Sequence, residues 1–383
     1  MHREVDSTIA FRNIWMIWTI VGINPPKRWR CLYAVYSVSI NFLVTIFCPI
    51  SAMIELLSST SVEKFMRNVV YHSEFVIISV KFFTLSRCLS TFRATNSMIS
   101  LLDANLETQD QKIRIQKMAA QSNRFFRIYF ASFNFVVVLN FLSVVFAGEK
   151  QLFCDLWFPF DWKKSDGVYW ATLGYHTLSM YMLSVIAVAN DYYAPLYFMI
   201  LIEHFQNLVD QMKSIGWNSS RSGARCGFPS SRKELIKCMK QHEVIMRIFR
   251  TLKPVISRTM FLQYLITALG LGLTVINIMY FAENSVEIAL FSIINLGILL
   301  KFLPCCFLGD RLAEINRGTI TALYSSNWID QSEEFKKTLI TFMELNKKEK
   351  YFYAGSLFRL NMSTFLAIVK FAYSLATFLN NMK

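Results

Sequence analysis

Seven long apolar runs constrain the fold of this chain more than any other feature of its sequence. Hydrophobic residues make up 54% of its 383 residues, and a soluble domain of this size has no core large enough to bury them. Each run is about 20 residues or longer, which is enough to cross ~30 Å of hydrocarbon as a helix. The sequence therefore predicts an all-α, polytopic membrane protein with seven transmembrane helices, at residues 31–57, 69–90, 125–147, 168–202, 258–281, 286–309 and 357–380.

The distribution of lysine and arginine predicts the orientation of the chain. Of the 40 basic residues, 27 lie in the N-terminal tail and in the segments after the second, fourth and sixth runs, whereas six lie in the segments on the opposite side. Lysine and arginine accumulate on the cytoplasmic side of membrane proteins. We therefore expect a cytoplasmic N-terminus and, because the number of spans is odd, an extracellular C-terminus. This is the reverse of the orientation of a G-protein-coupled receptor.

The tail at residues 1–30 contains charged residues and Trp15, Trp18 and Trp29 but no apolar core. We therefore expect no cleavable signal peptide, so that the first span acts as the signal anchor. Residues 11–20 have the pattern of an amphipathic helix, which we expect to lie in the membrane interface with its tryptophans at headgroup depth. An unstructured tail is the alternative.

Two long segments on the predicted cytoplasmic side, residues 203–257 and 310–356, have different patterns. In the first, Trp217–Ser231 is rich in Ser, Arg and Gly and is expected to be a flexible loop between two helical pieces. The second has apolar residues at helical spacing, namely Leu312, Ile315, Ile320, Leu323, Tyr324, Phe335, Leu339 and Phe342. Helices with apolar stripes outside the membrane need partners. We therefore expect a cytoplasmic helical assembly region, an anchor at which subunits associate.

The formal net charge of +14 does not indicate nucleic-acid binding. The basic residues are divided among four cytoplasmic segments, and the densest runs, Arg221–Lys240 and Lys336–Lys350, alternate with acidic residues or lie in Ser/Gly-rich stretches. Membrane topology and attraction to anionic lipid explain this charge better. We expect membrane lipid, and no nucleic acid, among the partners.

Motifs for catalysis and for metal binding are missing from the sequence. It has no P-loop, GxGxxG, HExxH or GxSxG motif, and its eight cysteines and five histidines have no zinc-ligand spacing. Cys154 is the one cysteine that we expect outside the cell, and the sequence suggests no partner for it. We therefore expect no enzymatic activity, no cofactor and no metal.

The last apolar run has an ordered stripe of small and polar residues. At about 100° per residue, the stripe consists of Val369, Tyr373, Ala376 and Asn380. The opposite face is apolar and consists of Ala367, Phe371, Leu375 and Phe378. Polar groups at this depth face water or a protein partner. Spacing alone leaves two interpretations open, a water-filled pathway and hydrogen bonding to neighbouring helices.

A set of short motifs, each weak alone, follows in order along the chain. Trp15, Gly22 and Pro25 stand near the N-terminus, and the second outer loop contains the aromatic run Trp157–Trp162. The other motifs follow the sixth span or lie in the last one: Cys306, Gly309, Ala322–Tyr324, Trp328, Thr364–Phe365, Lys370–Phe371, Tyr373–Leu375 and Thr377–Leu379. In these motifs the chain resembles the insect odorant receptors over its whole length.

The resemblance implies a function, a partner and a place in the cell. It implies an odorant-binding subunit that opens a ligand-gated, non-selective cation channel, formed as a heterotetramer with the olfactory co-receptor. The ligand would be a small, volatile, hydrophobic odorant. The location would be the plasma membrane of olfactory sensory neurons, in their dendrites.

The resemblance also implies a pore and a division of the chain. The last span would line the pore through Val369, Tyr373, Ala376 and Asn380. Ala376 and Asn380 would lie at its outer gate, where the co-receptor has apolar residues, so this subunit would contribute little to gate closure. The implied regions are a cytoplasmic tail (1–30), spans one to four with the ligand-binding bundle (31–202), a cytoplasmic loop with helix extensions (203–257), spans five and six (258–309), the anchor helices (310–356) and the pore-lining span (357–383).

In the odorant receptor family the ligand site lies in the outer halves of spans two to six. In this chain those halves are rich in aromatic and flexible apolar residues, as a small volatile ligand requires. The candidate ligand-binding residues are Tyr71, Phe75, Ile78, Phe135, Leu139, Leu142, His176, Met180, Tyr181, Ile276, Met279 and Tyr280.

Three other classes of protein fit the sequence less well. A gustatory-type channel of the same architecture is the nearest alternative, but the sequence Ser374–Thr377 after Tyr373 differs from the usual ending of that family. A G-protein-coupled receptor is disfavoured by the charge bias and by the absence of Asp-Arg-Tyr after span three and Asn-Pro-x-x-Tyr in span seven. A membrane enzyme fits the sequence less well again.

Overall fold

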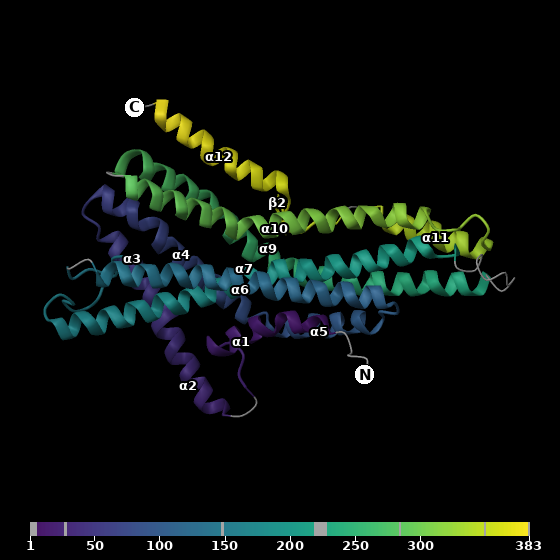
Figure 1. Ribbon diagram of the computed structural model, residues 1–383, viewed down its shortest axis with the longest axis horizontal. Helices are drawn as coiled ribbons and strands as arrows, with labels where there is room; N and C mark the ends of the chain where they lie inside the picture. The colour runs from purple at the N-terminus through teal and green to yellow at the C-terminus, as the bar shows by residue number, and fades with distance from the viewer. Residues whose placement is uncertain are drawn as a thin grey trace.

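The computed structural model describes residues 6–26, 29–146, 149–217, 228–282, 285–347 and 350–381. Within these ranges the side chains of residues 228–230, 286, 376, 379 and 380 lie outside the description. The described chain is a bundle of long helices that run along its longest axis (Figure 1). In chain order the elements are η1 (Ser7–Phe11), α1 (Arg12–Ile20), α2 (Arg30–Asn41), η2 (Phe42–Phe47), α3 (Cys48–Leu57), α4 (Val62–Ser86), α5 (Leu89–Ala104), α6 (Gln109–Val145), α7 (Asp166–Ser214), α9 (Phe228–Ile276), η3 (Asn277–Phe281), α10 (Ser285–Tyr324), α11 (Glu333–Leu345), β1 (Tyr353–Ala354), β2 (Phe358–Arg359) and α12 (Met362–Asn381).

The helices confirm the predicted all-α membrane architecture. Six helical stretches of the described chain are long and apolar enough to cross a membrane, and α12 contains a shorter apolar helix, Met362–Leu375. The first stretch is continuous through α2, the π-helical turn η2 and α3. The last span begins later than predicted, at Met362 rather than at residue 357, because the β1–β2 hairpin and its turn occupy the preceding residues.

Polar N-caps fix where several helices begin. Ser61, Ser165 and Ser332 each accept a hydrogen bond from the backbone N–H three residues further on. Thr108 does the same within a capping box completed by Gln111. These side chains satisfy backbone donors that a helix leaves free in its first turn. The boundaries of α4, α6, α7 and α11 are therefore encoded locally.

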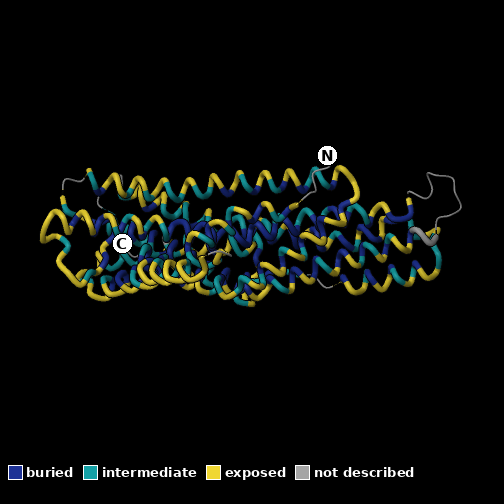
Figure 2. Tube along the Cα trace, turned by 90° about the horizontal axis from the view of Figure 1, so that it is seen from below, coloured by how far each residue is buried: buried dark blue, intermediate teal, exposed yellow. Residues whose placement is uncertain are grey.

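Helix α7 is the central element of the bundle. It packs against α6, α10, α9 and α4, and Tyr193, Tyr197 and Phe198 in its middle are fully buried. Figure 2 shows buried residues gathered along the middle of the bundle. Pro195 lies inside α7 and removes one backbone donor without ending the helix. The other long helices therefore share α7 as a common packing surface.

Helices α2 and α12 diverge from the bundle on opposite sides (Figure 1). No residue of α2 is buried, and of the described side chains of α12 only Ile368 is buried. The face of α12 that meets the bundle is closely packed, since a Cβ added at Gly272 of α9 would lie 2.9 Å from Leu375 Cδ2. Apolar side chains elsewhere on both helices are left to lipid or to other subunits.

The N-terminal helix packs on protein along one side, and its position in the membrane interface stays a prediction. Trp18 is 3% exposed, and its ring lies 5.1 Å from that of Phe92 in α5. Phe11 approaches Tyr197 of α7 with ring centroids 4.5 Å apart. The buried side of α1, with Ile14, Ile17 and Trp18, is therefore covered by protein, whereas Met16 and Ile20 are 55% and 43% exposed. An amphipathic stripe has the same sequence pattern whether it meets lipid or protein.

The part of the chain beyond the apolar runs is also helical. α10 continues to Tyr324, and α11 follows where the apolar spacing predicts a second helix. Leu312, Ile315, Leu323, Phe335, Leu339 and Phe342 are buried, whereas Tyr324 is 65% exposed.

A short hairpin then leads the chain into α12. Tyr353 pairs with Arg359 and Ala354 with Phe358. Gly355 and Ser356 at its turn both have a φ of about 60°, the left-handed region that favours glycine. The Gly355 N–H donates to the Ser257 carbonyl of α9 at 2.9 Å, so the start of α12 is fixed to α9.

Candidate functional site

A cavity of about 460 Å³ lies among α4, α6, α7 and α10. α4 contributes the face from Val70 to Ile78, and α7 the face from Leu173 to Ala187. α6 contributes residues from Tyr129 to Val144, and α10 residues from Ile293 to Lys301. The volume is typical of a site for one small molecule.

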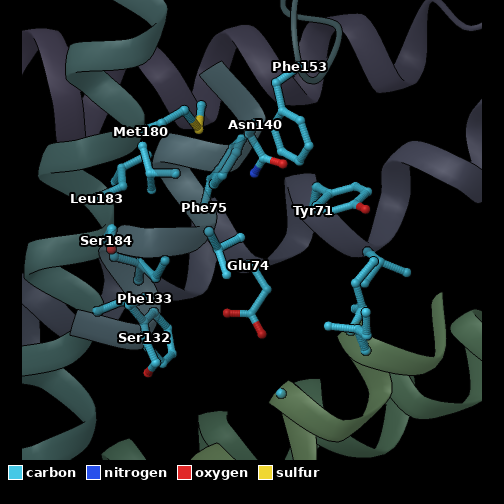
Figure 3. A pocket seen from close by; sticks show the side chains of 18 of the residues that line it. Tyr71, Glu74, Phe75, Ser132, Phe133, Asn140, Phe153, Met180, Leu183 and Ser184 are labelled. Atoms are coloured by element: carbon cyan, nitrogen blue, oxygen red, sulfur yellow. The ribbon is translucent and has the colours of Figure 1, made fainter. Parts of the chain in front are cut away.

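Aromatic and flexible apolar side chains line most of this cavity. Phe75, Phe153 and Met180 lie at one end of it in Figure 3. The ring of Tyr71 meets that of Phe153 edge to face, with centroids 5.6 Å apart. Such a wall favours an apolar ligand through burial of its surface and through dispersion contacts.

One end of the cavity holds an ion pair. Lys301 Nζ of α10 lies 3.1 Å from Glu74 Oε2 of α4, and these side chains are only 14% and 19% exposed. The same ammonium group lies 5.3 Å from the centroid of the Phe133 ring. Charged groups are costly in an apolar environment unless they are paired, and here each neutralises the other.

A second, fully buried ion pair lies next to the cavity. Lys81 of α4 pairs with Asp191 of α7, with side chains 2% and 8% exposed. Lys81 also donates to Gln263 Oε1 of α9 at 2.9 Å. Tyr129, which lines the cavity, donates to Asp191 Oδ2 at 3.5 Å. This polar cluster joins four helices at the centre of the bundle.

A histidine and a cysteine meet at the wall of the cavity. His176 lines it and lies with Nε2 at 3.5 Å from Cys154 Sγ. Cys154 is 3% exposed and is a free thiol among the described cysteines. Among the described residues no group of three or more potential ligands is placed to hold a metal ion.

Comparison with known proteins identifies the family. The model of the 7tm Odorant receptor family matches residues 61–373. The chain belongs to the insect odorant receptor family. Its homologues include Odorant receptor 33a of Drosophila melanogaster, 24% identical with 98% of this chain and 97% of that protein covered, and Odorant receptor 42a of the same fly, 27% identical with 95% and 89% covered.

Solved structures share the fold of this odorant receptor. The insect olfactory receptor OR5 from Machilis hrabei in complex with eugenol superposes with a TM-score of 0.81 at 15% identity, and 97% of this chain and 98% of that chain are covered. The structure of the same receptor described without eugenol gives a TM-score of 0.77. This chain is accordingly a multi-pass membrane receptor of the odorant receptor family, which is a family of receptors rather than enzymes.

Five of the twelve candidate ligand-binding residues line the cavity of the receptor. They are Tyr71, Phe75, Ile78, His176 and Met180. The other seven lie outside its lining. Phe135, Leu139 and Leu142 are 61%, 47% and 41% exposed on the outer side of α6, and Tyr181 is 41% exposed on α7. Ile276, Met279 and Tyr280 lie at the junction of α9 and η3.

The phase of α6 explains part of this difference. The cavity-facing residues Phe133, Val137, Asn140 and Val144 recur every three or four positions, the spacing of one helical face. Phe135, Leu139 and Leu142 follow the same spacing on the other side. Both faces are apolar in the sequence, so composition does not distinguish them.

Four charged residues in the cavity wall or beside it were absent from the predicted ligand-binding residues. The predicted spans contain all four of them, namely Glu74, Lys81, Asp191 and Lys301. A charged residue inside a membrane span is a candidate functional residue by default, so the signal was present for each of them. Their pairing was not visible, because Glu74 and Lys301 are 227 positions apart.

The pore candidates lie on α12. Tyr373 is 73% exposed, and Val369 is partly buried. The side chains of Ala376 and Asn380 lie outside the described part of the chain. The stripe is thus carried by a helix with little cover from its own subunit.

Proposed function

We propose that this odorant receptor is the odorant-binding subunit of a ligand-gated, non-selective cation channel. It forms the channel as a heterotetramer with the olfactory co-receptor, in the dendritic plasma membrane of olfactory sensory neurons. Its N-terminus is cytoplasmic and its C-terminus extracellular, which the bias of basic residues supports. The helices at residues 310–356 are the anchor region through which subunits associate.

The cavity among α4, α6, α7 and α10 is the observation that carries this proposal. In the proposed orientation it lies in the outer half of the membrane, where an odorant arrives. Its volume of about 460 Å³ and its aromatic wall fit one small hydrophobic molecule. The related fold of the Machilis hrabei receptor, solved in complex with eugenol, supports a small-molecule site in this architecture.

Helix α12 is proposed to line the ion pathway. Its stripe of Val369, Tyr373, Ala376 and Asn380 faces the axis of the tetramer, and the apolar opposite face meets lipid or the bundle. An odorant opens this pathway only through a higher affinity for the open state than for the closed state. The close contact of Gly272 with Leu375 supports mechanical contact between the bundle and α12.

Filling the cavity tests the proposal. A Cβ added at Gly297 of α10, which lines the cavity, meets no atom within 4 Å. Gly297→Leu therefore has free space at its Cβ, and we expect its larger side chain to take up room for a ligand. We expect a loss of agonist potency of about tenfold or more, equivalent to roughly 1.4 kcal/mol. The measurement is odorant-evoked current in cells that express the receptor with and without the co-receptor.

Gly174→Leu on α7 is the matched control. A Cβ there also meets nothing within 4 Å, but Gly174 does not line the cavity. Equal loss in both variants would mean that the cavity is not the odorant site. Full currents without the co-receptor would contradict the proposed heterotetramer.

Truncating one wall of the cavity should change the ranking of agonists. Phe75 lines the cavity, so Phe75→Ala removes contact surface worth roughly 1 to 3 kcal/mol, and by different amounts for odorants of different shape. Phe135→Ala removes the same group from a side chain that is 61% exposed outside the cavity and should leave the ranking unchanged. Substitutions at Ala376 or Asn380 should alter permeation or basal leak instead. The assignment of ligand-binding and pore residues would be wrong if the α12 variants changed the ranking of odorants while Phe75→Ala changed all currents by the same factor.

A further inference from the structure

Two buried and two partly buried charges gather at one end of the cavity. Glu74 and Lys81 lie seven positions apart on α4, and Asp191 and Lys301 come from α7 and α10. They form two ion pairs, Lys301–Glu74 and Lys81–Asp191. Their charges sum to zero, so a ligand beside them meets no net charge.

The Lys301–Glu74 pair is the one that a ligand can reach. Both residues line the cavity, whereas Lys81 and Asp191 do not. In Figure 3 the Glu74 carboxylate points away from Phe75 and Met180, toward the side on which Ser132 lies. The ion pair thus lies toward one side of the cavity, while Asn140 lies near Phe75 and Phe153 in the same view.

A further polar atom at the cavity wall lacks a partner. Ser184 lines the cavity and is nine-tenths buried. Its hydroxyl has no hydrogen-bond partner among the described residues. Buried polar groups are normally hydrogen-bonded, so this atom indicates a place where a ligand can supply the missing bond.

The hydrogen-bonding capacity of the ion pair is not exhausted by the pair itself. A lysine ammonium has three N–H donors and an ionised carboxylate has acceptor sites on both oxygens. The ion pair joins Lys301 Nζ to Glu74 Oε2 and leaves Glu74 Oε1 out of the contact. A hydroxyl or carbonyl oxygen of a ligand can accept from Lys301 while the pair stays closed.

A charged ligand has no such option. A ligand carboxylate would compete with Glu74 for Lys301 and leave Glu74 unpaired. A protonated amine would compete with Lys301 for Glu74 and leave Lys301 unpaired. Both outcomes leave a charge without a partner in an apolar wall, which is strongly unfavourable.

We propose that the Glu74–Lys301 pair makes this receptor selective for neutral odorants that carry one oxygen function, a hydroxyl or a carbonyl, and excludes carboxylic acids and amines. The inference rests on the proposed function, since it assigns the ligand class of the same cavity. Glu74 and Lys301 are the specificity-determining residues, and Ser184 offers a further hydrogen bond.

The test compares straight-chain alcohols, aldehydes, carboxylic acids and primary amines of four to ten carbons on cells that express the receptor with the co-receptor. Wild type should respond to alcohols or aldehydes at least about tenfold more sensitively than to the acids or amines. Glu74→Gln leaves Lys301 unpaired and should improve acid potency about tenfold relative to the alcohol. Lys301→Gln should do the same for the amine. The double variant Glu74→Gln/Lys301→Gln should improve the potency of neither the acids nor the amines relative to the alcohol.

A second ion pair serves as the control. Arg114 and Asp210 join α6 and α7 far from the cavity lining, at 2.7 Å. Arg114→Gln and Asp210→Asn should leave the ratios between ligand classes unchanged, and surface labelling gives the amount of receptor for each variant.

Several outcomes would overturn the inference. In one, wild type responds to none of the neutral compounds, or responds to the acids equally well. In another, the single variants of Glu74 and Lys301 change the potency of all ligand classes by the same factor. The last result would mean that the pair only ties α4 to α10. Gly297→Leu separates this failure from failure of the proposed function: if wild-type responses persist unchanged in that variant, the cavity itself is not the odorant site.

Discussion

Lys81→Met is expected to remove most of the folded receptor from the cell surface. The substitution leaves the Asp191 carboxylate without its ion-pair partner in a site where its side chain is 8% exposed. Breaking a buried ion pair by removing one member costs about 3 to 5 kcal/mol, a large share of a typical folding free energy of about 5 to 15 kcal/mol. Gln263 also loses the ammonium donor it accepts from. Surface labelling and thermal stability in detergent measure the loss.

The double variant Lys81→Met/Asp191→Leu separates charge from packing. It removes both charges and keeps side chains of similar size, so most of the surface receptor should return. Arg114→Met is the matched single substitution. The Arg114–Asp210 pair is 40% and 37% exposed, and removing such a pair costs about 0 to 1 kcal/mol. If Lys81→Met reached the surface as well as Arg114→Met, the buried pair would not be needed for folding.

Gly309→Val is expected to abolish odorant-evoked current through its effect on α12. A Cβ at this position of α10 would lie 2.6 Å from the Leu360 carbonyl oxygen and 3.3 Å from Leu360 Cβ. The first contact is with backbone, so no rotamer change relieves it. Overpacking of this kind costs about 1 to 3 kcal/mol or more. Leu360 lies two residues before the α12 start at Met362, so the helix must shift from its docked position.

Gly318→Val on the same helix isolates this steric effect. A Cβ there meets nothing within 4 Å, and both variants place the same β-branched residue in α10. We expect current per surface receptor to fall more than about tenfold in Gly309→Val and to change little in Gly318→Val. Normal current in Gly309→Val would contradict the idea that this contact positions α12.

The spans were predictable because length and apolarity alone decide them. Residues 168–202 and 258–281 lie within α7 and within α9 and η3. The start of the last span was not predictable in the same way. Leu357–Leu360 is apolar enough to extend the run, but the left-handed turn at Gly355 and Ser356 places these residues in a hairpin. A turn of this kind depends on contacts with α9 that lie far away in the sequence.

The lining of the cavity was predictable only where one face of a helix is distinctive. On α4, Tyr71, Phe75 and Ile78 share a helical face, and all three line the cavity. On α6, Phe133 and Phe135 are equivalent in composition, yet only Phe133 faces inward. In a membrane, both the lipid-facing and the protein-facing sides of a helix are apolar. Hydrophobic pattern therefore cannot assign the inner side.

The long helices extend beyond the membrane, so that one part of the core lies in lipid and another part in water. α7 and α9 have 49 residues each, or about 74 Å, whereas the hydrocarbon layer is only ~30 Å thick. Much of each helix therefore lies in water, where Phe205 meets His242 and His242 meets Phe342 in a part of the same continuous core. The part of the core in water is stabilised by the hydrophobic effect, and urea weakens this effect. Between helices in lipid there is no such driving force. Urea should therefore unfold the part of these helices outside the membrane while the part within the membrane stays assembled.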